Sequence, residues 1–170
     1  YLARGAEYLD KIRLKRCARC DTAMLFSAMS FPSIMHHGVA KYAPDITHLH
    51  WVSGNFFPMR AQAKLRTPVV FTMHDAWAFT GGCHCLLNCE AYQSQCGCCP
   101  ELGSTKEKDL SRRVWNLKRR VYAKLNPVFV APSRLHAAKA QRSSLLQGYR
   151  VEYIPNPVDA LFETVSGFTT

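Results

Sequence analysis

The chain has 170 residues, of which 48% are hydrophobic and 20% charged, so we expect one globular domain with a sizeable core rather than a disordered chain. No stretch approaches the roughly 18 to 20 uncharged apolar residues that a membrane-spanning helix needs. Its 22 lysine and arginine residues outnumber 12 acidic residues, and the net charge of +10 favours polyanions, acidic membranes or phosphorylated substrates. Nucleic acid is not expected, because no zinc-finger, RNP or homeodomain pattern accompanies the charge.

The positive charge is concentrated in two segments. Six cations lie between Arg4 and Arg19, and eight lie between Lys106 and Lys124. Each segment is either a solvated helix face or a surface that faces an anion, and the sequence leaves both interpretations open.

Strand and helix signals alternate from about residue 45 onward. In chain order we expect a strand at 45–51, a helix at 57–66 opened by Pro58, a strand at 68–73, an irregular segment at 75–103, a helix ending at 125, a strand at 128–131, a helix at 133–146 and a strand at 151–154. Ser104 and Glu107 have the spacing of a capping box for the helix that ends at Leu125. Ser133 is the expected N-cap of the next helix, and Gly148 its stop.

This alternation predicts an α/β fold with a Rossmann-like parallel sheet, right-handed crossovers and helices on both faces. Open α/β sheets bind their ligands beyond the carboxyl ends of the strands. Compact polar side chains follow the four predicted strands in turn, namely His48, His50 and Ser53, then His74 and Asp75, then Ser133, and finally Asn156. The sequence therefore predicts a polar cleft at that edge of the sheet.

Three common chemistries of α/β folds lack their motifs here. No G-x-G-x-x-G follows a predicted strand, which excludes the usual dinucleotide turn. The G-x-S-x-G nucleophile elbow of α/β-hydrolases and the phosphate loop of P-loop proteins are also absent. What remains is a His-Asp pair, a Thr80-Gly81-Gly82 turn and basic surroundings.

Six motifs, in order along the chain, resemble a subgroup of bacterial glycosyltransferases. They are His48-Leu-His-Trp51, Thr72-Met-His-Asp-Ala-Trp-Ala-Phe-Thr-Gly-Gly-Cys83, Cys96-Gly-Cys-Cys-Pro100, Asp109-Leu-Ser-Arg-Arg113, Ala131-Pro-Ser-Arg134 and Ile154-Pro-Asn-Pro-Val-Asp159. The subgroup belongs to the retaining family 4, of GT-B fold, which builds exopolysaccharide, capsule and lipopolysaccharide chains. The resemblance runs from about Phe31 to Phe162, and the ordered set of motifs is specific.

The resemblance implies that residues 1–170 form a partial N-terminal, acceptor-side Rossmann-like domain that carries a Cys-rich loop at 76–103. The family's first strand, with its glycine-rich loop, and its C-terminal donor domain, with a pair of glutamates, would then lie outside this chain. A first residue Tyr1 in place of Met leads to the same expectation. The implied enzyme would be a retaining hexosyltransferase, and this fragment would be inactive alone.

His74 and Asp75 are the expected catalytic residues. At the matching place in the family, a histidine after the strand lies near the transferred sugar, and an imidazole can hydrogen-bond a sugar hydroxyl or steady charge near neutral pH. Asp75 would accept a proton from the acceptor hydroxyl or orient His74. The alternatives are a structural histidine at the strand end and a turn carboxylate.

Substrate-binding roles are expected for the residues around this pair. Trp51 offers an apolar ring face to a sugar, although tryptophan is commonly a core residue. Turn amides at 53–55 and 80–82 could approach a ligand closely, and the helix start at Ser133 could hold a phosphate as well as serve as an ordinary N-cap. The expected substrate-binding set is His50, Trp51, Ser53, Asn55, Thr80, Gly81, Gly82, Ser133, Arg134 and Asn156.

Six of the eight cysteines crowd into residues 83–99. Four thiolates from one irregular stretch can close a tetrahedral zinc site and give structure to a loop with little core of its own. The subgroup shares the positions of Cys83, Cys89, Cys96 and Cys99, so these are the expected ligands of a structural zinc. Disulfides or free thiols are the alternatives.

Two functions of different classes follow. The first is a glycosyltransferase that moves a sugar from a nucleotide-sugar co-substrate to a glycan or lipid-linked acceptor in cell-surface polysaccharide biosynthesis. Its expected location is the cytoplasm or the inner face of the plasma membrane, with peripheral contact to anionic lipid. The second is a noncatalytic, zinc-stabilised module that binds polyanions through its basic face. Convergence of His50, His74, Asp75 and Thr80 in one cleft would favour the enzyme.

Overall fold

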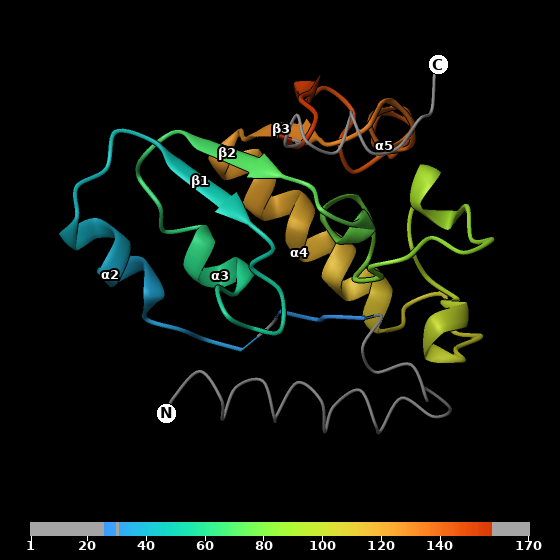
Figure 1. Cartoon of the computed structure of the whole chain (residues 1–170). Coiled ribbons are helices and arrows are strands. Elements are labelled where there is room, and N and C mark those ends of the chain that lie inside the picture. The colour runs from blue at the N-terminus through green and yellow to red at the C-terminus, as the bar shows by residue number, and fades with distance from the viewer. Residues whose placement is uncertain (1–25, 30, 158–170) are drawn as a thin grey trace, which may run out of the picture.

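A computed structural model describes residues 26–29 and 31–157 of the chain (Figure 1). Its centre is a four-stranded sheet with the strand order β1-β2-β3-β4, and every neighbouring pair is parallel. The strands are β1 (Thr47–His50), β2 (Val69–Thr72), β3 (Val128–Ala131) and β4 (Val151–Tyr153). The predicted α/β fold with a Rossmann-like parallel sheet is confirmed.

Helices connect successive strands, as the alternation predicts. The helices are α2 (Met35–Lys41), α3 (Met59–Gln62), α4 (Leu110–Leu125) and α5 (Arg134–Gln141). In Figure 1, α3 lies beside α4, and α5 packs against β3 and β4. The predicted elements omitted α2, which buries none of its residues and so lacks the apolar periodicity on which the prediction depends.

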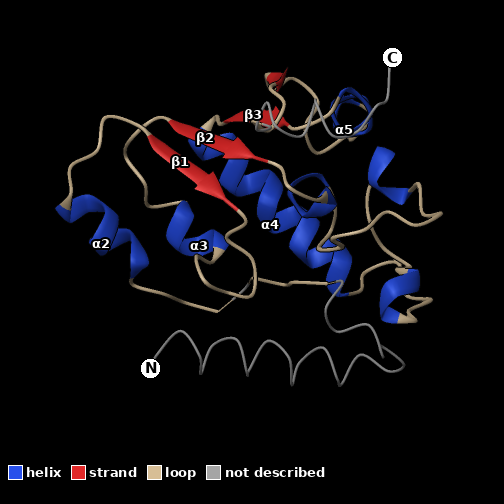
Figure 2. Ribbon diagram, viewed as in Figure 1, coloured by secondary structure: helices blue, strands red, loops and turns tan. Residues whose placement is uncertain are grey.

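Residues 75–103 are irregular apart from three short 3₁₀ helices, which Figure 2 shows among long loops. These 3₁₀ helices are η1 (Ala76–Phe79), η2 (Ala91–Gln93) and η3 (Pro100–Leu102). All four residues of η1 are buried, so this segment contributes to the core although it follows no regular pattern.

Two predicted helix boundaries are wrong at their N-terminal ends. The helix expected at 57–66 covers only Met59–Gln62, and Pro58 is its extended N-cap rather than part of its first turn. The expected capping box does not form, because Ser104 accepts a hydrogen bond from the Lys106 amide at 3.2 Å. Asp109 caps α4 instead, and its carboxylate suits the positive end of the helix dipole.

The helix expected at 133–146 ends early, at Gln141. The Ser143 hydroxyl donates to the Phe79 carbonyl at 2.7 Å and accepts from the Leu145 amide at 3.2 Å. This local bonding replaces helical hydrogen bonds and turns Leu145 and Leu146 into the core, where both are only 2% exposed.

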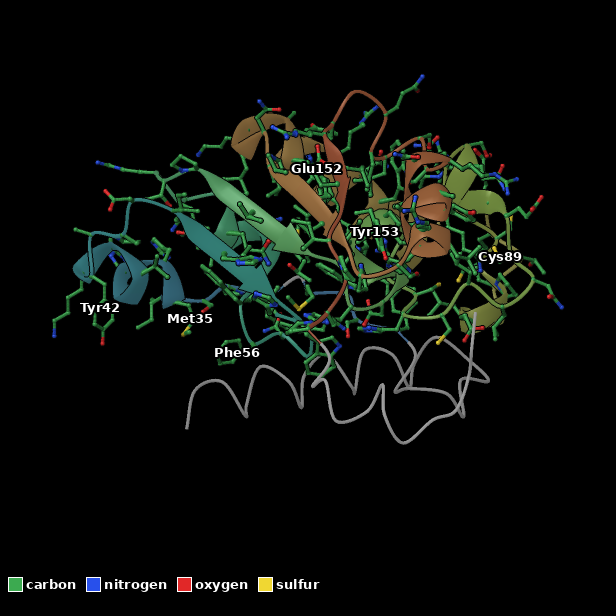
Figure 3. The ribbon with its side chains drawn as sticks, turned by 45° about the horizontal axis from the view of Figure 1, so that its top comes forward. Met35, Tyr42, Phe56, Cys89, Glu152 and Tyr153 are labelled. Carbon is green, nitrogen blue, oxygen red and sulfur yellow. The ribbon has the colours of Figure 1, made fainter. Side chains whose placement is uncertain are left out.

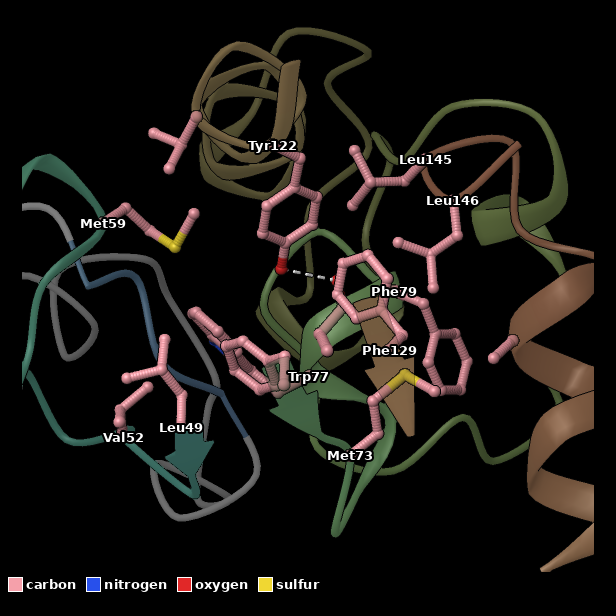
Figure 4. Close-up of a cluster of buried hydrophobic side chains, with 14 of the residues drawn as sticks. Leu49, Val52, Met59, Met73, Trp77, Phe79, Tyr122, Phe129, Leu145 and Leu146 are labelled. Atoms are coloured by element: carbon pink, nitrogen blue, oxygen red, sulfur yellow. Dashed lines mark hydrogen bonds between the residues drawn. The ribbon is translucent and has the colours of Figure 1, made fainter. Parts of the chain in front are cut away.

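Aromatic side chains from the sheet, η1 and α4 build the main core (Figure 4). Phe129 of β3 contacts Tyr122 of α4 edge-on with ring centroids 5.1 Å apart, and Phe71 of β2 stacks on Trp77. The Tyr122 hydroxyl donates to the Ala78 carbonyl at 2.9 Å, so this polar atom is buried with its partner. Each such side chain contributes about 1.5 to 3 kcal/mol by burial, which anchors η1 and the residues before it.

One ammonium group lies inside this core. Lys118 of α4 is fully buried, and its Nζ donates to the carbonyls of Trp77 and Thr80 while lying 3.5 Å from the centre of the Trp77 ring. These contacts tie α4 to the segment that follows β2. None of the helices in the described part of the chain is long and apolar enough to cross a membrane.

Candidate functional site

The carboxyl ends of β1 and β2 bring two histidines together. His50 pairs with Thr72 in the parallel register, so the residues that follow both strands emerge at the same edge. His50 Nδ1 lies 3.0 Å from His74 Nε2, within hydrogen-bonding distance, and both side chains are exposed. Partial burial and the neighbouring rings of His48 and His74 lower the pKa of His50. His50 and His74 therefore lie together at the edge of the sheet where this fold places ligands.

Asp75 is the centre of a hydrogen-bond network beside this pair. Its Oδ2 accepts from the Trp51 indole at 3.0 Å and from His84 Nδ1 at 2.6 Å. Its Oδ1 accepts from the Trp77 amide at 2.8 Å, which also caps η1. Donors from three different segments thus hold the two carboxylate oxygens, two of them on Oδ2 and one on Oδ1.

The network fixes the charge of Asp75. Burial raises the pKa of this carboxyl, but hydrogen bonds from His84, the Trp77 amide and Trp51 together outweigh it and lower the pKa below its ordinary value. Asp75 is therefore ionised at neutral pH, with 23% of its side chain exposed. The lowered pKa keeps Asp75 ionised, and its three donors hold it as a fixed negative charge.

Two residues of this network were missed by the sequence reasoning. His84 is buried, and its second nitrogen, Nε2, lies 2.9 Å from the Ser27 hydroxyl. With Nδ1–H directed at Asp75, Nε2 is the ring nitrogen that meets the Ser27 hydroxyl. Ser27, His84 and Asp75 thus form a chain of hydrogen bonds that ends at the sheet edge. No spacing rule connects residues 27 and 84, so only the folded structure brings them together.

A further histidine reaches the same turn from α5. His136 Nε2 donates to the Asp75 carbonyl at 3.1 Å, and burial lowers the pKa of this ring. The backbone of Asp75 is therefore fixed by α5 while its side chain is fixed by the loop after η1. His136 lies three residues after Ser133, the polar residue that follows the third strand. Sequence analysis could therefore have placed His136 near the same edge of the sheet.

Trp51 presents a ring to solvent beside the network. Its side chain is 60% exposed although its indole N–H is held by Asp75. A held ring with a free face is suited to contact the C–H face of a sugar. Trp51 is therefore not the core residue that the alternative expected. The neighbouring Trp77, by contrast, is a core residue and is 2% exposed.

The turn after β1 is less accessible than expected. Ser53 and Asn55 are 4% and 2% exposed. The Asn55 amide N–H contacts Met29 Sδ at 3.0 Å, while the side-chain nitrogen and oxygen of Asn55 have no partner among the described residues. Substrate contact at Ser53 and Asn55 stays a prediction.

The Thr80-Gly81-Gly82 turn is packed inside the protein. Thr80 Oγ1 donates to the Cys83 carbonyl at 2.7 Å, and the Gly81 amide donates to Cys96 Sγ at 3.1 Å. A Cβ on Gly81 would lie 2.6 Å from the Ser111 carbonyl oxygen, and one on Gly82 would lie 2.5 Å from the Phe26 ring. Close packing thus accounts for both glycines, and the structure does not support the expected ligand contact or a place for Thr80 beside His74.

The remaining expected substrate contacts lie at the ends of β3 and β4. Ser133 caps α5 by accepting from the His136 amide at 3.1 Å, as the N-cap alternative expects. The Arg134 guanidinium lies over the Tyr153 ring at 5.1 Å, and Asn156 is exposed. Their binding roles stay predictions.

The expected zinc site is not supported. In the part of the chain that the structure describes, no three or more His, Cys, Asp or Glu side chains are arranged to hold a metal ion. The residues expected as ligands do not converge on one point: Cys83 and Cys99 approach to 3.8 Å between sulfurs, whereas Cys96 Sγ accepts from Gly81. All six cysteines in 83–99 are free, so no disulfide joins them either.

Burial and pairing distinguish these thiols. Burial raises the pKa of Cys96 to about 11. The contact between Cys83 and Cys99 lowers the pKa of Cys99 and raises that of Cys83, because Cys83 then serves as the donor. Cys96 and Cys99 are buried and therefore act as small core residues between the turn after η1 and the start of α4.

The hollow at the carboxyl edge is small. A cavity of about 10 Å³ lies between Trp51, His74, Asp75 and Trp77. The described residues therefore hold a polar, aromatic surface at this edge and not an enclosed pocket.

Comparison with known families points to one class of enzyme. The family model described as Glycosyltransferase Family 4 matches residues 7–160 of the chain. No curated protein and no solved structure matches it.

Proposed function

The chain belongs to glycosyltransferase family 4, and we propose that it forms the acceptor-side domain of a retaining enzyme that builds cell-surface polysaccharide. In this proposal a sugar moves from a nucleotide-sugar to a lipid-linked or oligosaccharide acceptor. The observation that carries the proposal is the convergence of His50, His74 and Asp75 at the carboxyl edge of a parallel sheet.

The proposed roles follow from exposure and bonding. His74 is exposed, and its hydrogen-bond partner among the described residues is His50, so it can hydrogen-bond a hydroxyl of the transferred sugar. Asp75 holds the Trp51 indole, whose exposed ring would contact the apolar face of that sugar. Asp75 therefore orients Trp51, while its two roles expected from sequence, toward the acceptor proton and toward His74, stay predictions.

The transfer needs no reactant other than the nucleotide-sugar and the acceptor. The bond between the anomeric carbon and the nucleotide diphosphate breaks, a bond to the acceptor oxygen forms, and the acceptor proton leaves with the diphosphate or with water. The donor-binding half of the enzyme would supply the contacts to the nucleotide. The small hollow at the carboxyl edge agrees with a site that a second domain completes.

The test uses the full-length enzyme that contains this chain. His74→Ala should lower sugar transfer from nucleotide-sugar, measured as nucleotide diphosphate release, by about a hundredfold, because one positioned polar contact in a transition state contributes on that order. Its melting temperature should stay unchanged, since His74 is exposed. Lys139→Ala on α5 is the control. Full activity in His74→Ala would remove His74 from the mechanism.

Peripheral contact with the inner face of the plasma membrane is a further part of the proposal. Lys108, Arg119 and Arg120 are exposed on or beside α4, whereas Lys118 is buried and Arg112 donates to the Gln95 side chain at 2.9 Å. The basic surface of α4 is thus smaller than its sequence indicates. Co-sedimentation with anionic vesicles that weakens in high salt would support the contact, and equal recovery on neutral vesicles would contradict it.

The noncatalytic zinc module is not supported as an alternative. It required the thiols of 83–99 to form one metal site, and the described residues form none. The convergent histidines would also have no role in a module that binds only through its outer helices.

A further inference from the structure

A cavity of about 760 Å³ opens at the end of the sheet opposite His74. Its wall contains Thr67, which precedes β2 and bonds to Thr47 of β1 through hydroxyls 2.6 Å apart. Lys124, in the last turn of α4, lies near the start of β3. The cavity is therefore at the amino ends of the strands, separated from the carboxyl edge by the length of a four-residue strand, about 10 to 13 Å. Its volume is in the range of small-molecule sites, roughly 300 to 1,000 Å³.

The charge of the cavity is of one sign. Lys64, Arg66 and Lys124 line it together with His36 and His37, and no acidic residue is among the described residues of its wall. These basic residues come from α2, the segment before β2 and the end of α4. In the described part of the chain none of the three permanent cations makes an ion pair. Three segments thus bring unpaired positive charge to one concave surface.

One of the histidines in the wall, His36, has its Nδ1 shielded from solvent. Partial burial and the positive neighbours His37 and Lys64 lower the pKa of His36. An anion in the cavity would offset the repulsion between these positive groups.

The remaining wall is apolar, with Val39 and Leu65 packed beside the cations. Two large exposed hydrophobic residues lie close in sequence to the wall residues Ala43 and Pro44: Tyr42, labelled beside α2 in Figure 3, is 83% exposed, and Ile46 is 58% exposed. A bare anion needs only the cations, whereas an anion attached to an organic group would also use these apolar surfaces.

From these contacts we propose that the cavity lined by His36, Lys64, Arg66 and Lys124 is a binding site for a phosphate group. The phosphate belongs to a small phosphoester or diphosphate, or to the headgroup of an anionic lipid. Cationic side chains that converge from separate elements are the usual means of holding phosphate oxygens. The site goes beyond the proposed transfer reaction, because it shares no residue with the carboxyl edge.

The experiment titrates inorganic pyrophosphate into the purified chain by calorimetry in phosphate-free buffer. The cavity variant is Lys64→Gln/Arg66→Gln. The control is Arg142→Gln/Arg150→Gln, which removes the same charge from exposed positions outside the cavity and outside the basic surface of α4. Circular dichroism verifies that both variants are folded. The cavity variant should bind about tenfold more weakly than the wild type, and the control within about twofold of it.

A second arm separates the two sources of phosphate. Co-sedimentation with phosphatidylglycerol vesicles is measured for the wild type, the cavity variant and Tyr42→Ser. Loss of vesicle binding in both variants identifies a lipid headgroup, and loss of pyrophosphate binding alone identifies a free phosphate compound. Either result supports the site. Absence of pyrophosphate and vesicle binding in the wild type, or equal weakening in the cavity and control variants, would overturn it.

Discussion

His84 donates a hydrogen bond through Nδ1 to Asp75 Oδ2 at 2.6 Å, and this contact joins the loop after η1 to the carboxyl edge of the sheet. The His84 carbonyl also accepts from the Ala76 amide at 2.9 Å, so side chain and backbone meet the same turn. The orientation of Asp75, and through it that of Trp51, therefore depends on a residue that faces no ligand.

The first prediction concerns this contact. His84→Phe fills a similar volume but leaves Asp75 without its shortest hydrogen bond and Ser27 without its partner, so it should destabilise the protein by about 1 to 3 kcal/mol. His84→Asn, which can keep the donor near the Nδ1 position, should recover part of that loss. Urea unfolding of the three proteins measures both effects. Equal stability of His84→Phe and the wild type would contradict the importance of the network.

The second prediction concerns acid stability. The folded pKa of Asp75 lies below its unfolded value of 3.8, so the unfolded state binds this proton more readily. The stability from the ionised carboxylate is present above the unfolded pKa and is lost as pH falls through the folded pKa. Asp75→Asn lacks this carboxylate, so its stability should fall less steeply than that of the wild type as the pH is lowered. Urea unfolding midpoints of both proteins from neutral to acidic pH measure the difference. A matched pH dependence in both proteins would show that Asp75 is not held as described.

Much of the fold was predictable because its two central strands, β2 and β3, are largely buried on both faces. The run at 68–73 is nearly all apolar and can only be covered by other elements, so β2 and its parallel partners followed from sequence. The His50–His74 contact was equally predictable in outline, since His50 ends β1 and His74 follows the parallel strand β2.

The rest of the site depends on contacts that local patterns do not encode. The hydrogen bond from Ser27 to His84 spans 57 positions, and the buried role of Thr80 comes from the packing of Gly81 and Gly82 against distant residues. The spacing of the cysteines suggested a metal because four thiols close in sequence can converge, but the described residues form no group that could hold a metal ion.

The third prediction tests the arrangement of the thiols. The sulfurs of Cys83 and Cys99 lie 3.8 Å apart and need only a small approach to bond at about 2.04 Å. When the chain is treated with the thiol oxidant diamide, two electrons and two protons pass to the oxidant, and the first disulfide should join Cys83 and Cys99. Mass spectrometry of tryptic peptides identifies the pair, with Cys99→Ser as the control. A different first pair would contradict the geometry.

The last prediction concerns the charge buried in the core. Burial lowers the pKa of Lys118 to about 7, against 10.5 for an exposed lysine, despite its contacts with two carbonyls and the Trp77 ring. Between these values the unfolded state is protonated and the folded state is not, so stability should rise with pH across the window. The wild type should gain on the order of 2 kcal/mol relative to Lys118→Met between about pH 7 and about pH 9, measured by urea unfolding. Lys108→Met changes an exposed lysine, so its stability should depend on pH in the same way as that of the wild type. A constant difference between Lys118→Met and the wild type over this range would show that the ammonium stays charged, held by its carbonyl partners.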